Sequence, residues 1–455
     1  MKTLNYVIYP ILSLLLSLKS GNSISSAINS LQEKGKITVV TRISNNTISH
    51  KNNEELNGPE FDLINKFSQF VKTPVDLVVI KEHLSLEEIM KNYDADIVVL
   101  GANVTSDIPS LAEIPHSKSR ESLVCNKTLR KDSPFVVTID SKLAFLTTEI
   151  ETKFPKASVL TLNSKSPEDF MKFISEKNAD CTVVPKNIAL TNKRFFNNLS
   201  IVYTTSQKVN ISWFVKRDEY GMGNLVQHWF RSIKDSGLYA QIKERHYGHL
   251  SSSSGFESRI LHSRYKTRLP YYIPMFKQAE KKSGISWKLL SAISYQESHW
   301  NPRAESFTGV RGMMMLTQST ARTLGVKDRN NALDSILGGA KYLNQIKDLL
   351  PLNIQEPDRT WMALAAYNVG LGHLEDAMDL CKKLGKNYTS WKDMQTILPL
   401  LSVKSYYKTL KFGKARGLEP VQYVQRIRNY FDQIAHLDSK PGSVEFRIPL
   451  YAANN

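Results

Sequence analysis

The strongest constraint on the fold is a change of hydrophobic pattern at the stretch SSSSG, residues 251–255. Before it, β-branched runs such as GKITVVTRI (35–43) and DADIVVLG (94–101) alternate with amphipathic stretches such as 56–71. Beyond it, apolar residues recur at roughly 3.6-residue spacing with almost no strand pattern. The first pattern predicts an α/β unit with a mostly parallel sheet, and the second predicts an all-α unit.

The chain length of 455 residues is enough for two or three separate cores. The strand and helix pattern recurs at 157–205, which predicts two lobes and a cleft in the α/β unit. We expect continuous helices at 226–248, 259–281 and 286–299. The expected divisions are a signal peptide at 1–27, an α/β unit at 28–250 (lobe 1 at about 35–125 and 215–250, lobe 2 at about 130–210), a linker at 251–258, an all-α unit at 259–440 and a tail at 441–455.

The N-terminus has the pattern of a secretory signal peptide. Lys2 gives a positive start, residues 6–18 form an uncharged and largely apolar run, and small residues follow at 20–27. The apolar run is short for a membrane span, although an uncleaved anchor remains an alternative. No later stretch approaches 18 consecutive apolar residues. The sequence therefore predicts an exported protein.

The cysteine and histidine content gives little sign of a metal site. Export permits a disulfide between Cys125 and Cys181, but with Cys381 the number is odd, and small buried residues are the simplest interpretation. His246 and His249 lack a third ligand at suitable spacing, so we expect a solvated pair. We predict no metal and no cofactor.

The net charge of +17 lies mostly in the second half of the chain. Residues 256–455 contain 29 Lys and Arg against 17 Asp and Glu. A basic surface suits an anionic partner such as nucleic acid, a membrane surface or an acidic polymer. A solvated basic surface without a specific partner is the alternative.

One acidic residue occupies an apolar helical stripe. Ile285, Leu289 and Ile293 recur every four residues, and Glu297 is the next member of the series. Burial of a carboxyl raises its pKa because the charged form loses hydration. A carboxyl that is still protonated near neutral pH suits a general acid for glycosidic cleavage. A structural, partly buried glutamate is the alternative interpretation.

Four motifs follow in order along the helical half: ESHWNP (297–302), SFTGVRGMMML (306–316), AYNVGLG (366–372) and EPVQYVQRI (419–427). Together they resemble the motifs of the soluble lytic transglycosylase family, whose fold is similar to that of goose-type lysozyme. The triple methionine, the YQESHW context and the preceding α/β unit resemble the membrane-bound lytic murein transglycosylase F family. That family joins a domain similar to periplasmic solute-binding proteins to a catalytic domain.

This resemblance implies a peptidoglycan lytic transglycosylase that cleaves the bond between N-acetylmuramic acid (MurNAc) and N-acetylglucosamine (GlcNAc) and forms a 1,6-anhydro product. Glu297 would be the single catalytic acid and base. Met315 stands where the wider family has glutamine, and Trp300 is a further candidate sugar platform. The other residues implied to bind or support the substrate are Ser306, Met314, Tyr367, Asn368, Glu419 and Tyr423.

The resemblance also implies a location and a partner. Peptidoglycan becomes the anionic partner, and the enzyme would lie in the periplasm, peripherally at the inner face of the outer membrane. A nucleic-acid partner is disfavoured because the chain has a signal-like N-terminus and no nucleic-acid-binding motif. The competing hypotheses are a lysozyme-like hydrolase and a non-catalytic envelope receptor that only binds glycan or a solute.

The α/β unit lacks the residues that hold amino acids in the solute-binding proteins it resembles. Ile108 or Pro109 falls where those receptors carry a carboxylate-binding arginine. Pro185 and Lys186 stand where an aspartate would hold the amino group. Binding of a free amino acid is therefore disfavoured. We expect a regulatory unit that senses muropeptides, or an inert scaffold.

Overall fold

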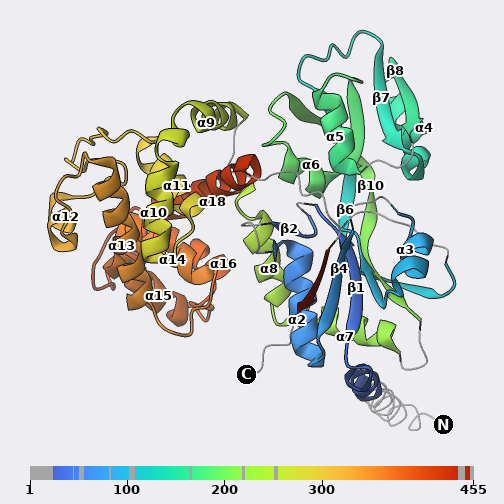
Figure 1. Cartoon of the computed structure of the whole chain (residues 1–455), viewed down its shortest axis with the longest axis horizontal. Coiled ribbons are helices and arrows are strands. Elements are labelled where there is room, and N and C mark those ends of the chain that lie inside the picture. The colour runs from blue at the N-terminus through green and yellow to red at the C-terminus, as the bar shows by residue number, and fades with distance from the viewer. Residues whose placement is uncertain are drawn as a thin grey trace. The chain divides into compact units, whose positions relative to one another are not determined.

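The computed structural model describes residues 24–44, 46–50, 56–80, 84–101, 108–162, 166–217, 221–250, 255–438 and 446–450. The chain divides into two compact units, Met1–Ile242 with Pro441–Asn455 and Lys243–Lys440 (Figure 1). The signal peptide predicted at 1–27 lies outside the described residues except for 24–27, which begin a helix that ends at residue 34. Within the described part of the chain, no helix is long and apolar enough to cross a membrane.

The first unit has the α/β fold that the sequence predicts. Its elements are β1 (Ile37–Arg42), β2 (Ser49–His50), β3 (Leu56–Asn57), α2 (Pro59–Val71), β4 (Val75–Ile80), α3 (Leu86–Tyr93), β5 (Ile97–Val99), β6 (Leu111–Asn126), β7 (Phe135–Asp140), η1 (Ser141–Leu146), α4 (Thr147–Lys153), β8 (Ala157–Leu162), α5 (Pro167–Ser175), β9 (Cys181–Pro185), α6 (Lys186–Asn192), β10 (Leu199–Lys216), α7 (Met222–Asp235), α8 (Leu238–Tyr247) and β11 (Phe446–Leu450).

Nine strands form one sheet in the order β11-β4-β1-β5-β10-β6-β9-β7-β8. The neighbours β4, β1 and β5 are parallel, as are β8, β7 and β9. The long strands β6 and β10 pair antiparallel with each other, and they join these two parallel groups (Figure 1). Separate apolar cores lie on the two groups, with Phe67 and Trp229 in one and Phe170 in another. The unit is therefore built as two lobes on a shared antiparallel ribbon.

Several features of this unit differ from the sequence prediction. The predicted tail supplies β11, which pairs antiparallel with β4, and the long strand β6 has no counterpart in the prediction. The helix expected at 226–248 is divided into α7 and α8, because Gly237 adopts a left-handed φ of 79° between them. The cysteines interpreted as separate buried residues form a disulfide, since Cys125 of β6 lies directly opposite Cys181 of β9. Cys381 is buried and free.

The second unit is all-α, as predicted. Its elements are α9 (Gly255–Thr267), η3 (Leu269–Tyr271), α10 (Ile273–Ser283), α11 (Trp287–Ser298), α12 (Gln318–Leu324), α13 (Ala332–Leu349), α14 (Asp358–Val369), α15 (Leu371–Lys383), α16 (Trp391–Ile397), η4 (Leu398–Ser402), α17 (Lys404–Tyr407) and α18 (Leu418–Asp438), together with the end of α8.

The helix expected at 259–281 is interrupted, and α9, η3 and α10 take its place. Pro270 and Pro274 explain the break, because proline has no backbone N–H to donate and is accommodated only in the first turn of a helix. Both prolines lie in first turns in the structure. Inside the unit, α11 and α14 pack on α18 around one large apolar core.

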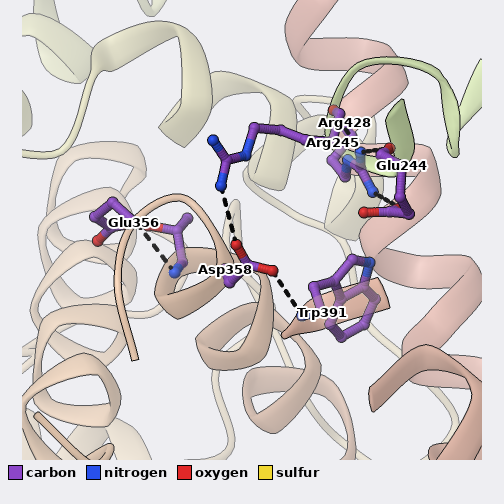
Figure 2. Close-up of polar contacts among 7 residues, drawn as sticks. Glu244, Arg245, Glu356, Asp358, Trp391 and Arg428 are labelled. Atoms are coloured by element: carbon purple, nitrogen blue, oxygen red, sulfur yellow. Dashed lines mark hydrogen bonds and ion pairs between the residues drawn. The ribbon is translucent and has the colours of Figure 1, made fainter. Parts of the chain in front are cut away.

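Buried polar contacts attach the end of α8 to the rest of the second unit (Figure 2). Arg428 of α18 is 1% exposed, and its Nη1 lies 2.7 Å from Oε1 of Glu244. Its Nη2 donates to the carbonyl oxygens of Glu244 and Arg245 at 2.9 and 2.7 Å. His249 is also buried, and its Nε2 lies 2.6 Å from Asp432 Oδ2. The prediction of a solvated histidine pair is thus wrong for His249.

Candidate active site

Glu297 lies in the last turn of α11, a helix whose apolar residues belong to the core of the second unit. The helix is buried on most sides, with Leu290 and Ile293 fully inaccessible, while Glu297 keeps some exposure. The surrounding protein desolvates the carboxyl and raises its pKa to about 7. Both the acid and the carboxylate are therefore accessible near neutral pH. A group of this kind can donate a proton and accept one in the same reaction cycle.

Tyr423 of α18 is the hydrogen-bond partner of Glu297. Its buried hydroxyl donates to Oε1 of the carboxyl, across 126 positions of sequence. Burial, and secondly the charge of Glu297, raise the pKa of Tyr423 well above its usual value, so it remains a donor. This hydrogen bond stabilises the ionised carboxylate and opposes part of the effect of burial.

Tyr367 of α14 lies within electrostatic range of the same carboxyl. Burial raises the pKa of Tyr367 well above its usual value, and the charge of Glu297 is the second cause. Its hydroxyl donates to the carbonyl oxygen of Met314 at 2.9 Å. Its ring packs on Tyr342 of α13, with 5.1 Å between centroids. Tyr367 therefore joins the loop before α12 to the surroundings of Glu297.

Small residues of α11 and α13 hold the loop that contains the three methionines. Ser294 and Ser298 of α11 both donate to the carbonyl oxygen of Met313, at 3.1 and 2.9 Å. The side chain of Met314 is fully buried, and a Cβ on Gly339 of α13 would lie 2.7 Å from three of its atoms. Close approach of α13 to this loop thus depends on glycine.

The structure brings only some of the predicted site residues together. Glu297, Tyr423, Tyr367 and the backbone of Met314 are connected by the contacts above. Ser306 instead stabilises its own turn, where its Oγ accepts the N–H of Val310 at 3.2 Å.

Two further predicted residues have exposed side chains. Asn368 is exposed next to Tyr367. Glu419 is exposed and pairs with Arg416 at 3.2 Å, and no contact joins it to Glu297 within the described residues. Both therefore remain predictions.

Sequence reasoning overlooked the residues that hold the loop. Ser298 follows Glu297 in the ESHW motif, and its spacing of four from Ser294 was the available signal for a shared role. Trp300, a candidate sugar platform, is 1% exposed, and its Nε1 donates to the carbonyl of Ser291 at 2.8 Å. It is a core residue. The described residues contain no group of three His, Cys, Asp or Glu that could hold a metal ion.

Comparisons with known proteins show which family the chain belongs to. Residues 274–389 match the family model described as Transglycosylase SLT domain. The chain is 34% identical over 414 residues to Membrane-bound lytic murein transglycosylase F 2 of Alkalilimnicola ehrlichii, covering 88% of this chain and 92% of that protein. It is also 34% identical over 426 residues to Membrane-bound lytic murein transglycosylase F of Idiomarina loihiensis, covering 91% and 93%.

Among solved structures, the amino acid ABC transporter substrate-binding protein AbpA from Streptococcus pneumoniae is similar to about half of the chain. It is 14% identical, with a TM-score of 0.41, covering 48% of this chain and 98% of that one. The ArgBP mutant from T. maritima is 15% identical, with a TM-score of 0.39, covering 49% and 99%.

Proposed function

Because the chain belongs to the membrane-bound lytic murein transglycosylase F family, we propose that it cleaves peptidoglycan as a lytic transglycosylase. The bond cleaved is the β-1,4 linkage from MurNAc to GlcNAc, and the product ends in 1,6-anhydroMurNAc. The observation that carries this proposal is the partly buried carboxyl of Glu297, to which the buried hydroxyl of Tyr423 donates. Burial raises the pKa of this carboxyl to about 7. One carboxyl with such a pKa can serve as both acid and base.

In the first step, the protonated carboxyl of Glu297 gives its proton to the glycosidic oxygen. The bond from that oxygen to C1 of MurNAc breaks, and GlcNAc leaves with a free C4 hydroxyl. Positive charge develops at C1, where the substrate's own acetamido oxygen stabilises it. Glu297 is then a carboxylate, and the hydrogen bond from Tyr423 stabilises that form.

In the second step, the Glu297 carboxylate takes the proton of the C6 hydroxyl of MurNAc. The C6 oxygen attacks C1 and closes the 1,6-anhydro ring, so no water is consumed. Glu297 ends protonated, as it began. A pKa near 7 suits this exchange, because both the acid and the carboxylate forms of Glu297 are accessible at neutral pH, and the C6 hydroxyl loses its proton as its oxygen bonds to C1.

The surroundings of Glu297 support a mechanism that uses one carboxyl. Hydrolytic glycosidases use a second carboxyl about 5 to 10 Å away as nucleophile or base. Burial is the cause of the raised pKa of Glu297, and no acidic residue in the described part of the chain is among the groups that shift it. This favours intramolecular attack by the substrate over activation of water.

The remaining predicted residues are proposed to position the sugar. Asn368 is exposed beside Tyr367 and is suited to hydrogen-bond an acetamido group. Ser306 shapes the turn in front of the methionine loop, and Met314 acts through its backbone carbonyl. Glu419 has the weakest support, because its contact is to Arg416.

We also propose an envelope location for the enzyme. The family name describes its members as membrane-bound, and the N-terminal sequence resembles a secretory signal. These support export to the periplasm and peripheral association with the inner face of the outer membrane. For the first unit we propose muropeptide binding, because the anchors for a free amino acid are missing from its sequence.

The decisive experiment is mass spectrometry of murein digested by the protein and by its Glu297→Gln variant. We expect products lighter by one water than hydrolysis products, and a loss of rate of at least about 100-fold in the variant, the usual contribution of a general acid or base. Glu305→Gln is the control, since Glu305 lies in an exposed ion pair with Arg311. Reducing ends in the wild-type digest would indicate a hydrolase, and unchanged activity of the Glu297 variant would refute the site.

A further inference from the structure

A strongly basic segment lies between two motifs of the proposed active site. We call residues 404–416 the basic segment. Residues 394–418 contain no Asp or Glu, so no acidic neighbour in the chain offsets its charge. The cationic side chains of the segment are all exposed: Lys404, Lys408, Lys411, Lys414 and Arg416.

Most of these charges have no acidic partner. Arg416 pairs with Glu419 at 3.2 Å. The four lysines form no ion pair with any residue that the structure describes. Elsewhere in the unit, lysines do find carboxylates, for example Lys347 with Glu356 at 2.7 Å. Lys411 lies over the ring of Phe412, 5.1 Å from its centroid, and no carboxylate of the described residues neutralises any of the four lysines. Their charges are therefore available to an external anion.

The backbone of the basic segment is fixed by a buried carboxylate. Asp376 of α15 is 4% exposed, and its two oxygens accept the N–H groups of Lys411 and Phe412 at 3.0 and 2.8 Å. Further along, Ala415 donates its N–H to the carbonyl of Leu401 at 3.1 Å. A fixed backbone reduces the entropy lost when the lysines bind a ligand.

The basic segment is attached on both sides to elements that carry the proposed site. The ring of Phe412 packs on Gly372, where a Cβ would lie 2.7 Å from it. Gly372 ends the AYNVGLG motif, which contains Tyr367. On the other side the chain continues directly into α18, where Tyr423 donates to Glu297. The basic segment is therefore joined on both sides to elements that carry the proposed site.

We propose that the basic segment is a substrate subsite that binds the carboxylates of peptidoglycan stem peptides. This inference rests on the proposed function and adds a peptide-recognition site to it. Stem peptides are attached to the MurNAc residues of each strand and carry free carboxylates. Flexible lysine ammonium groups suit such anions, whose positions vary from one repeat to the next.

An anionic membrane surface fits the basic segment less well. Peripheral helices that lie in a membrane interface present a long amphipathic face. The helix within the segment, α17, has four residues. Phe412 is 47% exposed, but it lies outside this helix and adds no amphipathic face to it.

The test compares two triple variants that remove the same charge from the full-length chain. The first is K404Q/K408Q/K414Q. The matched control is K281Q/K327Q/K383Q, whose lysines are also exposed in the second unit. Each carries Glu297→Gln to prevent cleavage, and binding to purified murein sacculi is measured by sedimentation at low and high salt. Equal melting temperatures would establish that both variants are folded.

We expect the first triple to bind sacculi roughly eightfold more weakly, a factor of about two for each exposed ion pair, and the control to change less than about twofold. The difference should shrink at high salt. It should also disappear on glycan strands whose stem peptides have been removed by an amidase. Replacing the same three positions by arginine should restore binding.

Three results would overturn the proposal. These are equal weakening by both triples, a loss that persists on peptide-free strands, and a loss seen only with vesicles of anionic phospholipid. Binding does not require bond cleavage, so an error in the chemistry assigned to Glu297 would appear separately. In that case the Glu297→Gln protein would still degrade the sacculi.

Discussion

Replacement of Tyr423 by phenylalanine should move the pH dependence of cleavage upward. The hydroxyl of Tyr423 donates to the Glu297 carboxyl and lowers a pKa that burial otherwise raises. A hydrogen bond to a charged group contributes about 1.5 to 3 kcal/mol. At about 1.4 kcal/mol for each pKa unit, its loss should raise the pKa of Glu297 from about 7 by roughly one to two units.

The assay is kcat/KM on soluble murein fragments, measured across pH with product detection by mass spectrometry. The free enzyme must hold Glu297 protonated, so kcat/KM should fall as pH rises through its pKa. In the Tyr423→Phe variant this fall should occur roughly one to two pH units higher. The rate at the optimum should also decrease, because the carboxylate formed in the first step loses its donor.

Tyr430→Phe is the matched control for this experiment. Tyr430 lies on the same helix, is also buried, and packs on Tyr295 with 4.8 Å between ring centroids. Removing the hydroxyl of Tyr430 should leave the pH at which kcat/KM falls unchanged. If kcat/KM of the Tyr423→Phe variant falls at the same pH as in the wild type or at a lower pH, the role given to this hydrogen bond is refuted. An equal upward shift in the control would refute it as well.

Three further outcomes follow from the same contacts. Glu297 has a folded pKa of about 7 against 4.5 in its unperturbed state, so its ionisation costs stability as pH rises between these values. Glu297→Gln should therefore raise the free energy of unfolding by about 2 to 3 kcal/mol more at about pH 8.5 than at about pH 5, in denaturant titrations, and a pH-independent effect would contradict this. Arg428→Met should destabilise the chain by about 3 to 5 kcal/mol, since the Glu244 carboxylate loses its buried partner, and adding Glu244→Gln should recover part of the loss. Gly339→Ala should lower both the melting temperature and the activity, because the new methyl group meets Met314; activity retained at full stability would argue against the role of this contact.

Much of the fold follows from local patterns. The β-branched runs at 35–43 and 94–101 become β1 and β5. The change of pattern near 255 predicts an α/β unit followed by an all-α unit, although the boundary itself falls after Ile242. Two of the helices that were predicted as continuous are interrupted by a helix-breaking residue, Gly237 in one and Pro270 in the other. The long strand β6 was not expected either, since its residues mix polar and apolar side chains, and its pairing with β10 stabilises it.

The candidate site was likewise only partly predictable from the sequence. Helical periodicity placed Glu297 on a buried face, because that inference needs only neighbours within a few turns. Periodicity did not reveal that Tyr423, 126 positions away, donates to its carboxyl, or that Ser298 holds the carbonyl of Met313. The pairing of Cys125 with Cys181 likewise depended on the register of β6 and β9.

The sequence by itself determined the class of each unit and pointed to Glu297 as the candidate catalytic residue, because local period and motif order encode both. Only the tertiary structure decided how far Glu297 is buried and which residues tune its pKa. A pKa depends on the burial and hydrogen bonds that distant segments provide after packing, and these contacts have no local signature in the chain.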